Sequence, residues 1–300
     1  MKILKPQPLK SGDTIAIVGV SKKIAVEELM PAVELLNSWG LEVLLAENLK
    51  KNYHIYSGTD DERLNGFQEM INHPKVKAIL CSRGGYGATR IIDQVDFKPL
   101  VQHPKWIIGF SDITVLLNSA LLHQVESIHG PMAFQFKDEK YQTSIESLRQ
   151  LLFGEPYVVM ASPNALNIPG IAKGPIAGGN LTMLTNMPGT KYDLDLSGKI
   201  LLLEDIEEYI YKIDRMMVHL KRAGKLQTLA GVIVGHFTDM LDNDPPFGKT
   251  VHEVILEHVG KENIPVAFGF PAGHEPENMA LFFGREATLE VTENGARLSY

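Results

Sequence analysis

The sequence is poor in cysteine, because Cys81 is the single one in 300 residues and the chain therefore forms no internal disulfide. A protein that relies on no disulfide is typical of a reducing compartment. No run of about eighteen uncharged apolar residues, the length that a helix needs to cross a bilayer, occurs in the sequence. The N-terminal segment 1–20 has prolines where a secretory signal peptide needs an apolar stretch. These absences predict a cytoplasmic protein without a membrane span.

Positive charge is also scarce. The chain has 29 lysines and arginines against 36 aspartates and glutamates, which gives a net charge of -7. Proteins that bind nucleic acid or anionic membranes carry an excess of basic residues, so neither partner is expected. The sequence contains no G-x-G-x-x-G and no G-x-x-x-x-G-K-[ST], so nucleotide binding has no specific support.

The first half of the chain has a regular alternation of strand-like and helix-like segments. Short apolar runs, which are typical of buried parallel strands, occupy residues 14–20, 41–47, 76–82 and 105–110. Segments with helical spacing or helix-start signals lie between and after them, at residues 26–40, 59–74, 87–95 and 112–124. This alternation predicts a doubly wound parallel sheet, which binds ligands at the carboxyl ends of its strands.

The pattern changes after Phe153. Residues 154–175 are rich in glycine, proline, asparagine and serine and have no helical period, which indicates a linker or an irregular β segment. Strand-like and helix-like segments resume beyond it. We therefore expect an N-terminal α/β domain over residues 1–153, a linker over 154–175, and a smaller α/β or barrel-like domain over 176–300.

Ser111 lies at the end of a predicted strand, in the sequence Gly-Phe-Ser-Asp. A nucleophile on a strained strand-to-helix turn is surrounded by small residues, and the following helix directs its N–H groups at the reaction centre. Gly109 stands two residues before the serine, but no glycine stands two after it. The alternative is that Ser111 only caps the helix that follows.

A glycine-rich turn follows the third predicted strand. Gly84, Gly85 and Gly87 lie within Ser-Arg-Gly-Gly-Tyr-Gly, where backbone amides could closely approach a phosphate or a reaction oxyanion. A tight turn that needs one glycine at positive φ is the alternative, and it explains three glycines less easily than one.

Two further residues complete a possible set of catalytic groups. Glu204 ends an apolar strand, where a carboxylate needs a partner, and Asp205 could cap the next helix in its place. Glu207 and Glu208 are expected in the first turn of that helix. His274 lies in a loop after another apolar run. Ser111, His274 and Glu204 would supply the hydroxyl, the proton acceptor and the orienting carboxylate of an acyl-transfer enzyme.

Other interpretations stay open beside this one. Cys81 could be a thiol nucleophile, although Ser82 and Arg83 separate it from the glycines and buried cysteines are usually inert. The chain could instead be a ligand-binding module without catalysis. The acidic segment 236–244 contains one histidine and three aspartates, but its spacing fits no common zinc pattern, so no metal is expected.

Several spaced motifs in this chain resemble the LD-carboxypeptidase family, which includes murein tetrapeptide carboxypeptidases and, as a branch, microcin C immunity hydrolases. The motifs are SRGGYGATR, IIGFSDIT, HGPM, AGGNLTML, LLLEDIEE and GFPAGH, and they occur in this order. The resemblance runs from residue 11 to near the end of the chain. It implies a flavodoxin-like N-terminal domain, a smaller β-rich α/β C-terminal domain, and commonly a homodimer without metal or cofactor.

The resemblance also assigns roles to residues. It implies that Ser111 is the nucleophile, Glu204 and His274 complete the triad, and the backbone amides of Asp112 and Gly85 receive the oxyanion. The implied activity is cleavage of an L,D-peptide bond, most simply release of D-alanine from murein tetrapeptide in cell-wall recycling. Hydrolysis of a peptidyl-nucleotide antibiotic of the microcin C type is the alternative.

Three residues are candidates for binding the substrate. Arg83, beside the glycine turn with Gly84, is a candidate for holding the free carboxylate that a carboxypeptidase recognises. An exposed surface arginine is the alternative. Asn180 could line the cleft or simply cap the segment that follows it. His129 matches the family, and we expect it to have a structural role.

Overall fold

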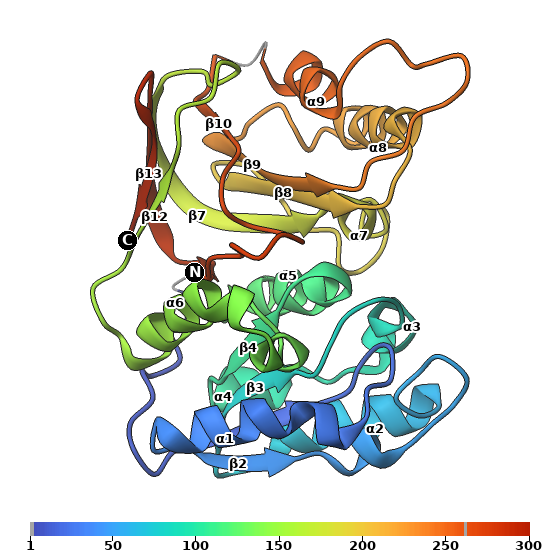
Figure 1. Cartoon of the computed structure of the whole chain (residues 1–300), viewed down its shortest axis with the longest axis vertical. Helices are drawn as coiled ribbons and strands as arrows, with labels where there is room; N and C mark the ends of the chain where they lie inside the picture. Colours follow the sequence, from blue (N-terminus) through green and yellow to red (C-terminus); the bar gives the residue numbers. More distant parts are fainter. Residues whose placement is uncertain (1–2, 261–262) are drawn as a thin grey trace. The chain divides into compact units, whose positions relative to one another are not determined.

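The computed structural model describes residues 3–260 and 263–300, and residues 1, 2, 261 and 262 lie outside the description. The chain divides into two compact units (Figure 1). The first unit takes in the chain up to Pro156 together with Met279–Gly284, and the second takes in Tyr157–Asn278 with Arg285–Tyr300. Among the described residues, no helix combines the length and apolar character that crossing a bilayer requires.

The first unit is built on a six-stranded sheet in the order β11-β5-β4-β3-β1-β2. Its strands are β1 (Thr14–Val18), β2 (Glu42–Leu45), β3 (Val76–Cys81), β4 (Trp106–Gly109), β5 (Ser127–His129) and β11 (Leu281–Phe283). Strands β1 to β5 pair in parallel, in the order 2-1-3-4-5. That order is the flavodoxin-like one, so the predicted fold of this part is confirmed.

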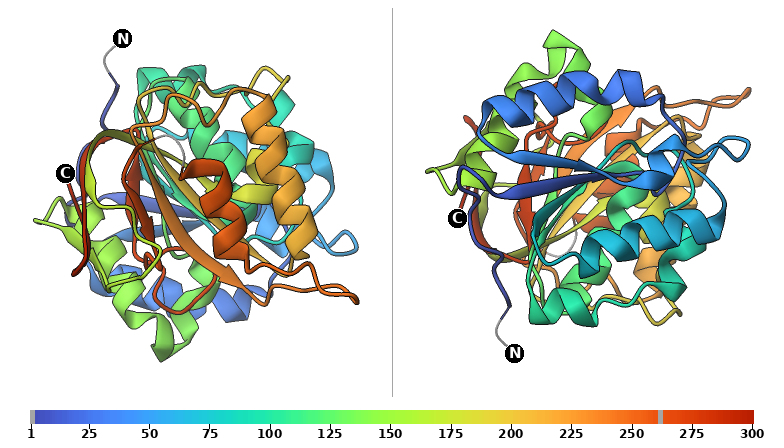
Figure 2. Two further views of the ribbon diagram at one scale, coloured as in Figure 1. Left: turned by 90° about the horizontal axis from the view of Figure 1, so that it is seen from above. Right: turned by 90° about the horizontal axis from the view of Figure 1, so that it is seen from below.

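Helices cover both faces of this sheet (Figure 2), with α1 and α6 on one face and α2 and α5 on the other. The α-helices of the unit are α1 (Met30–Ser38), α2 (Asp60–Asn72), α3 (Ala88–Ile91), α4 (Lys98–Gln102), α5 (Thr114–Leu122) and α6 (Gln142–Phe153). The 3-10 helices are η1 (Val26–Leu29), η2 (Glu47–Lys50), η3 (Ile92–Gln94), η4 (Ser111–Ile113), η5 (Ala133–Lys137) and η6 (Glu139–Tyr141).

The start of α2 follows its sequence signal closely. Thr59 accepts a hydrogen bond from the backbone N–H of Glu62, whose side chain accepts one from the N–H of Thr59. This reciprocal capping box satisfies two backbone donors that a helix start would otherwise leave unpaired. The helix therefore begins where the threonine and the acidic first turn predict.

Strand β11 is a difference from the sequence-based expectation. Leu281–Phe283 comes late in the chain, yet it pairs antiparallel with β5, with Leu281 opposite His129. The short segment 279–284 therefore belongs to the first unit, whereas we expected that unit to end at residue 153. Three residues are too few to show a strand period, so only the tertiary pairing identifies this edge strand.

The second unit contains a seven-stranded sheet in the order β10-β9-β8-β7-β12-β13-β6. Its strands are β6 (Val158–Ala161), β7 (Gly170–Asn180), β8 (Ile200–Ile206), β9 (Gly231–Thr238), β10 (Val266–Phe268), β12 (Glu286–Thr292) and β13 (Gly295–Ser299). Strands β7 to β10 are parallel, and β12, β13 and β6 continue the sheet antiparallel. The expectation of a β-rich α/β unit is confirmed.

The helices of the second unit are α7 (Leu181–Leu184), α8 (Ile210–Arg222) and α9 (Val251–Val259). Helices α8 and α9 lie side by side in both figures, and His258 contacts Asp214 across them at 3.0 Å. One face of α8 is buried through Ile210, Ile213, Met217 and Leu220. This spacing is the helical period of an amphipathic helix that packs on a sheet.

The predicted linker over 154–175 contains regular β structure. Val158–Ala161 forms β6, which pairs with β13, and β7 begins at Gly170. Of the two alternatives that the composition left open, the β segment is the one observed. Strand β6 lies at the edge of the sheet, and alternate residues in it are exposed. Its sequence therefore has little apolar pattern, and the prolines and glycines around it resemble those of a linker.

Candidate active site

Ser111 sits on a strained turn between β4 and α5. Its backbone φ is 61°, in the left-handed region that a serine rarely adopts, at a cost of about 1–3 kcal/mol. It is the first residue of η4, whose N-cap is Phe110, and the N-cap of α5 is Ile113, so Ser111 is the cap residue of neither helix. The helix-cap alternative is therefore not what the geometry shows. The strained strand-to-helix turn matches the arrangement of a nucleophile elbow.

The glycine before this turn has a packing reason. A Cβ at Gly109 would lie 2.9 Å from Cγ1 of Ile113, closer than real Cβ contacts. The chain can therefore turn tightly from β4 into η4 only with glycine at position 109. The backbone carbonyl of Ser111 accepts a hydrogen bond from the N–H of Thr114, which continues the turn into α5.

The glycine-rich turn after β3 lies against Ser111. A Cβ at Gly84 would come within 3.2 Å of Cβ and 3.3 Å of Oγ of Ser111. Gly85 and Gly87 have φ values of 109° and 145°, which favour glycine strongly. Gly85 and Gly87 are thus favoured by backbone conformation, and Gly84 by its tight approach to Ser111. Backbone amides of this turn lie near the serine, as an oxyanion site needs.

Arg83, in the same turn, is half-buried. Its guanidinium lies over the ring of Phe134, 5.6 Å from the ring centroid, a cation–π distance. Its positive charge also contributes to lowering the pKa of Glu28, after the larger effect of the hydrogen bond from Lys137. Arg83 is therefore packed against its own unit and is not a freely exposed arginine. Its role toward a substrate carboxylate stays a prediction.

In the second unit, Glu204 and His274 form a hydrogen-bonded pair. Glu204 lies on β8 with its side chain fully buried, and its Oε2 is 2.7 Å from Nδ1 of His274. A carboxylate only accepts hydrogen bonds, so Nδ1 carries the proton and donates it. This leaves Nε2 as the nitrogen able to accept a proton from another group.

The charge of Glu204 changes the acidity of His274. Burial by itself lowers the pKa of the imidazole, but the nearby carboxylate of Glu204 and its hydrogen bond raise it by more, and the net direction is upward. Asp205 and Glu207 add smaller contributions of the same sign. The pair is thus arranged to stabilise an imidazolium, as a general base requires.

Small residues allow the His274 loop to approach Glu204. Gly273 has a φ of 126°, and a Cβ there would lie 3.1 Å from both Cβ and Oε2 of Glu204. The N–H of Gly273 donates to Oδ1 of Asn278, a fully buried side chain. A Cβ at Gly235 would collide with the carbonyl of Ala272, at 2.2 Å. Glycines at both positions therefore bring the imidazole to the carboxylate.

The sequence left open that Asp205 caps the helix after β8, but the N-cap of α8 is Tyr209. Asp205 accepts hydrogen bonds from the backbone N–H and Oγ1 of Thr182, both at 2.9 Å, and from Nδ2 of Asn180 at 2.9 Å. Burial has the largest effect on the pKa of Asp205 and repulsion from Glu204 the next largest, and together they raise it to about 6. Helix α7 begins directly after β7, and the end of β7 pairs with β8 at Glu204. Asp205 is therefore next to the start of α7 and holds it.

The residues around Asp205 resolve two more expectations. Asn180 accepts a hydrogen bond from the N–H of Met183 and so caps α7, which is the second of its two predicted roles. Glu207 and Glu208 precede α8, whose N-cap is Tyr209, and Glu207 has a φ of 57°. They are therefore not in the first turn of a helix, because the left-handed backbone at Glu207 delays its start.

The competing sites find less support. Cys81 is fully buried, and burial, together with the negative charge of Asp112, raises the pKa of its thiol strongly. Such a thiol is a poor nucleophile at neutral pH. No group of three or more metal-binding side chains occurs among residues 3–260 and 263–300. His129 is buried, with its ring stacked on Phe283 at 5.7 Å.

Each unit gathers its own share of the predicted residues. The first holds Ser111 beside the glycine turn, with Asp112 and Arg83. The second joins Glu204 to His274 and places Asn180 opposite Glu204 in the pairing of β7 with β8. The contribution of Gly273 was missed by the sequence reading, although its place directly before a candidate histidine was a usable signal.

The sequence matches known families along most of its length. The model of the LD-carboxypeptidase N-terminal domain matches residues 15–130, and that of the LD-carboxypeptidase C-terminal domain matches residues 173–289. The chain belongs to the LD-carboxypeptidase family. A probable murein peptide carboxypeptidase of Bacillus subtilis is 35% identical over 300 residues, which cover 97% of this chain and 93% of the relative.

Solved structures agree with this family membership. The muramoyltetrapeptide carboxypeptidase from Oxalobacter formigenes is 30% identical, with a TM-score of 0.87 over 95% of this chain and 97% of that one. The microcin C7 self immunity protein MccF, in complex with aspartyl sulfamoyl adenosine, has a TM-score of 0.86 over 99% of this chain and 98% of its own. At 23% identity, the likeness to MccF shows a shared fold.

Proposed function

We propose that this LD-carboxypeptidase family member is a serine carboxypeptidase that hydrolyses an L,D-peptide bond. The observation that carries the proposal is the 2.7 Å hydrogen bond between buried Glu204 and His274. A histidine with a raised pKa and a fixed tautomer is suited to take a proton from a serine. Ser111, on its strained turn, is the serine that supplies the hydroxyl.

The proposed reaction has two steps. Oγ of Ser111 attacks the carbonyl carbon of the scissile bond while Nε2 of His274 takes the hydroxyl proton. The C–N bond then breaks, and the same proton passes from His274 to the leaving amine. Water next attacks the acyl ester, giving its proton to His274, which returns it to Oγ as the ester bond breaks. This sequence requires Ser111 and His274 to meet in the working enzyme.

The negative charge that develops on the carbonyl oxygen needs donors. We assign this role to the backbone N–H groups of Asp112 and Gly85, because the helix start and the glycine turn lie beside Ser111. Loss of one such donor costs about 3 kcal/mol of transition-state stabilisation. The proposal needs no metal and no organic cofactor.

The proposed substrate is a murein tetrapeptide, from which the enzyme releases D-alanine in cell-wall recycling in the cytoplasm. Support comes from the names of two relatives that are at least 30% identical, a probable murein peptide carboxypeptidase and a muramoyltetrapeptide carboxypeptidase. Arg83 is proposed to bind the free carboxylate of the substrate, with Gly84 beside it and Asn180 as a further contact. As the resemblance implies, we expect a homodimer.

A mass-spectrometric assay tests the proposal. The protein is incubated with L-Ala-γ-D-Glu-meso-diaminopimelate-D-Ala and, separately, with a peptidyl-adenylate. We expect release of D-alanine from the tetrapeptide and a much slower reaction of the adenylate. The reverse preference would favour the microcin-type alternative. No reaction with either substrate would contradict the proposed class of hydrolase.

Two serine variants locate the nucleophile. Ser111→Ala should reduce turnover by about 10⁶-fold, as loss of a nucleophilic serine does in other hydrolases. Ser38→Ala is the matched control, because Ser38 is exposed and its Oγ only donates to the carbonyl of Leu35 on the same helix. Release of D-alanine by Ser111→Ala at the parent rate would show that another residue attacks the substrate.

A further inference from the structure

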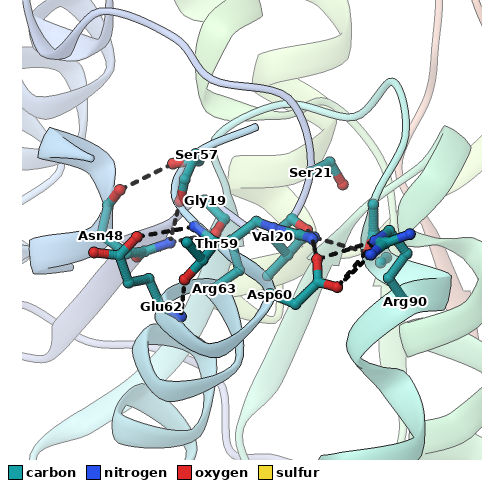
Figure 3. Close-up of polar contacts among 12 residues, drawn as sticks. Gly19, Val20, Ser21, Asn48, Ser57, Thr59, Asp60, Glu62, Arg63 and Arg90 are labelled. Atoms are coloured by element: carbon teal, nitrogen blue, oxygen red, sulfur yellow. Dashed lines mark hydrogen bonds and ion pairs between the residues drawn. The ribbon is translucent and has the colours of Figure 1, made fainter. Parts of the chain in front are cut away.

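A buried arginine, Arg63 of α2, reaches from its helix to the loop after β1 and to the glycine turn (Figure 3). Its side chain has no exposed surface, and its Nη1 donates to the carbonyls of Val20 at 2.7 Å and of Gly87 at 2.8 Å. A buried guanidinium is costly unless it has such acceptors. It therefore ties two backbone segments together, the loop after β1 and the glycine turn.

The other groups around Arg63 keep its guanidinium in place. Its Nη2 contacts Asp60, and its guanidinium lies over the ring of Tyr56 at 4.7 Å. Asp60 also pairs with Arg90, whose Nη2 lies 2.6 Å from Oδ2, on the side away from Arg63 (Figure 3). The hydrogen bond from Arg90, together with the charge of Arg63, lowers the pKa of Asp60. Arg63 thus has an ionised partner at neutral pH.

A buried carboxylate holds the same two segments from the opposite side. Oδ2 of Asp112 accepts hydrogen bonds from Oγ of Ser21 at 2.5 Å and from the N–H of Ala88 at 2.8 Å. Asp112 is 2% exposed and directly follows Ser111. Burial raises the pKa of this carboxyl, against the opposing effects of the two hydrogen bonds and the charge of Arg63.

The two charges act on one peptide group. The carbonyl of Gly87 accepts from Arg63, and the N–H of the next residue, Ala88, donates to Asp112. The loop after β1 is held in the same way, through the carbonyl of Val20 and the hydroxyl of Ser21. Arg63 and Asp112 therefore form a two-sided clamp, which we call the Arg63–Asp112 clamp.

The loop on the β1 side of the clamp is itself anchored. Asn48 donates from Nδ2 to the carbonyls of Gly19 and Ser57, and Oγ of Ser57 donates to the carbonyl of Asn48 at 3.1 Å (Figure 3). The N–H of Ser57 donates in turn to the carbonyl of Ser21 at 3.1 Å. The clamp therefore connects the glycine turn to a loop that is itself held by several hydrogen bonds.

The glycine turn needs such a hold because its own sequence favours no single conformation. Gly85 and Gly87 have φ values of 109° and 145°, and glycine loses more conformational freedom than other residues when it is fixed. A Cβ at Gly87 would lie 2.6 Å from Nη1 of Arg63, so the backbone approaches the guanidinium as closely as glycine allows. The hydrogen bonds of the clamp therefore restrict the backbone of the turn to one conformation, which its glycines alone would not do.

We infer that Arg63 and Asp112 are positioning residues, whose grip on the Gly87–Ala88 peptide fixes the glycine turn beside Ser111. The inference rests on the proposed function, in which an amide of this turn receives the oxyanion. Neither side chain takes part in bond making. A shift of about 1 Å in a catalytic group is enough to cost about 100-fold in rate. A loosened turn therefore lowers kcat more than it weakens substrate binding.

The test uses the full chain with Arg63→Met, Arg63→Lys and Asp112→Asn. We expect Arg63→Met to lower kcat about 10- to 100-fold, with KM changed less than about threefold. Arg63→Lys should recover part of kcat, because an ammonium can reach one of the two carbonyls. Arg63→Met combined with Asp112→Asn should lose less than the product of the single losses, because both residues hold one peptide.

Lys105→Met is the matched control for burial of a cation. Lys105 is 3% exposed, and its Nζ donates to the carbonyls of Met70 and His73, at the opposite end of β4 from Ser111. This variant should lose stability as Arg63→Met does, while kcat of the folded protein stays within about twofold. An equal loss of kcat in Lys105→Met would overturn the inference, because it would show a general effect of destabilisation.

Hydrogen exchange separates the clamp from the proposed activity. In Arg63→Met, amides in a peptide spanning residues 82–91 should exchange at least tenfold faster, while those of α9 exchange as in the parent. Unchanged exchange in Arg63→Met and Arg63→Lys, or unchanged kcat in an active parent background, overturns the inference. If the parent releases no D-alanine, the proposed function fails and the catalytic role of the clamp fails with it. Faster exchange would then establish a purely structural clamp.

Discussion

Nδ1 of His274 lies 2.7 Å from Oε2 of Glu204, although the two residues are separated by 70 positions in the chain. The carboxylate is fully buried, and the imidazole is 13% exposed. A carboxylate in this setting fixes which ring nitrogen is protonated and raises the pKa of the imidazole.

Glu204→Gln should lower kcat by about 10⁴-fold, as loss of the orienting carboxylate does in a serine triad. A glutamine of the same shape keeps the packing but can also donate to Nδ1, which stabilises the wrong tautomer. Steady-state kinetics of D-alanine release measures the change.

The control for Glu204→Gln is Glu207→Gln, because Glu207 is exposed and has a smaller electrostatic effect on the same histidine. We expect its kcat to stay within about threefold of the parent. A loss below tenfold in Glu204→Gln would contradict the assignment of Glu204.

The pH profile of kcat/KM should have an acidic limb that reflects His274. The imidazole acts as a base only when it is neutral, so activity rises as the pH passes upward through its pKa. Because Glu204 raises that pKa above the ordinary 6.5, the midpoint of the limb should also lie above 6.5. In Glu204→Gln the midpoint should move to lower pH. A parent midpoint below 6.5, or a midpoint that is the same in both proteins, would be incompatible with the pair as described.

Gly85→Ala should impair catalysis through the backbone of the glycine turn. Its φ of 109° is strained for alanine, and the new Cβ would lie 2.5 Å from Cδ of Lys22. We expect kcat to fall about 100-fold as the amide shifts, measured as release of D-alanine.

Gly12→Ala is the comparison for backbone strain. Gly12 has a φ of 88°, but a Cβ there would meet no atom within 4 Å beyond its two chain neighbours, and it belongs to a turn before β1. It should lose about 1–2 kcal/mol of stability without loss of kcat. Equal activities of Gly85→Ala and Gly12→Ala would argue against a catalytic amide in the glycine turn.

Cys81 should be inert in the native protein. Its thiol is fully buried, and burial and the charge of Asp112 both raise its pKa. Iodoacetamide should therefore leave the native mass and the activity unchanged, and should add one carbamidomethyl group in denaturant. Rapid inactivation with labelling at Cys81 would contradict this prediction and would support a thiol nucleophile.

Asp205 should make stability depend on pH. Burial and Glu204 raise its pKa in the folded state to about 6, above the value near 3.9 that is typical of an unfolded chain. Between about pH 4 and 6 the folded state binds more protons, so this residue makes folding less favourable as the pH rises, by about 3 kcal/mol in all.

The variant Asp205→Asn tests this linkage. Urea unfolding of the parent and the variant at pH 4 and pH 7 should show that the variant gains stability relative to the parent at the higher pH. Asp195→Asn is the control, because hydrogen bonds from Ser197 lower the pKa of Asp195. This variant should therefore lose stability relative to the parent at the higher pH, which is the opposite change. A constant difference between Asp205→Asn and the parent at both pH values would contradict the raised pKa.

Local signals in the sequence located most of the elements of the two sheets. The apolar run before Gly109 predicted β4, and the Thr59–Glu62 pattern predicted the start of α2. Such signals are legible because a strand or a helix start depends on the preferences of neighbouring residues. The edge strands β6 and β11 were not predicted because they are short and are defined by pairing with β13 and β5. Strand β7 was not predicted either, because its glycines and proline interrupt the apolar pattern of a strand.

By itself, the sequence determined the alternation of strands and helices in the first half of the chain, the glycines at the turns and the candidate residues Ser111, Glu204 and His274. The tertiary structure alone decided that Glu204 meets His274, that Asp205 supports α7, and that Arg63 is buried beside the glycine turn. The reason is physical. Backbone preferences are local in the chain, whereas the burial and pairing of a charge depend on segments that approach each other only after folding.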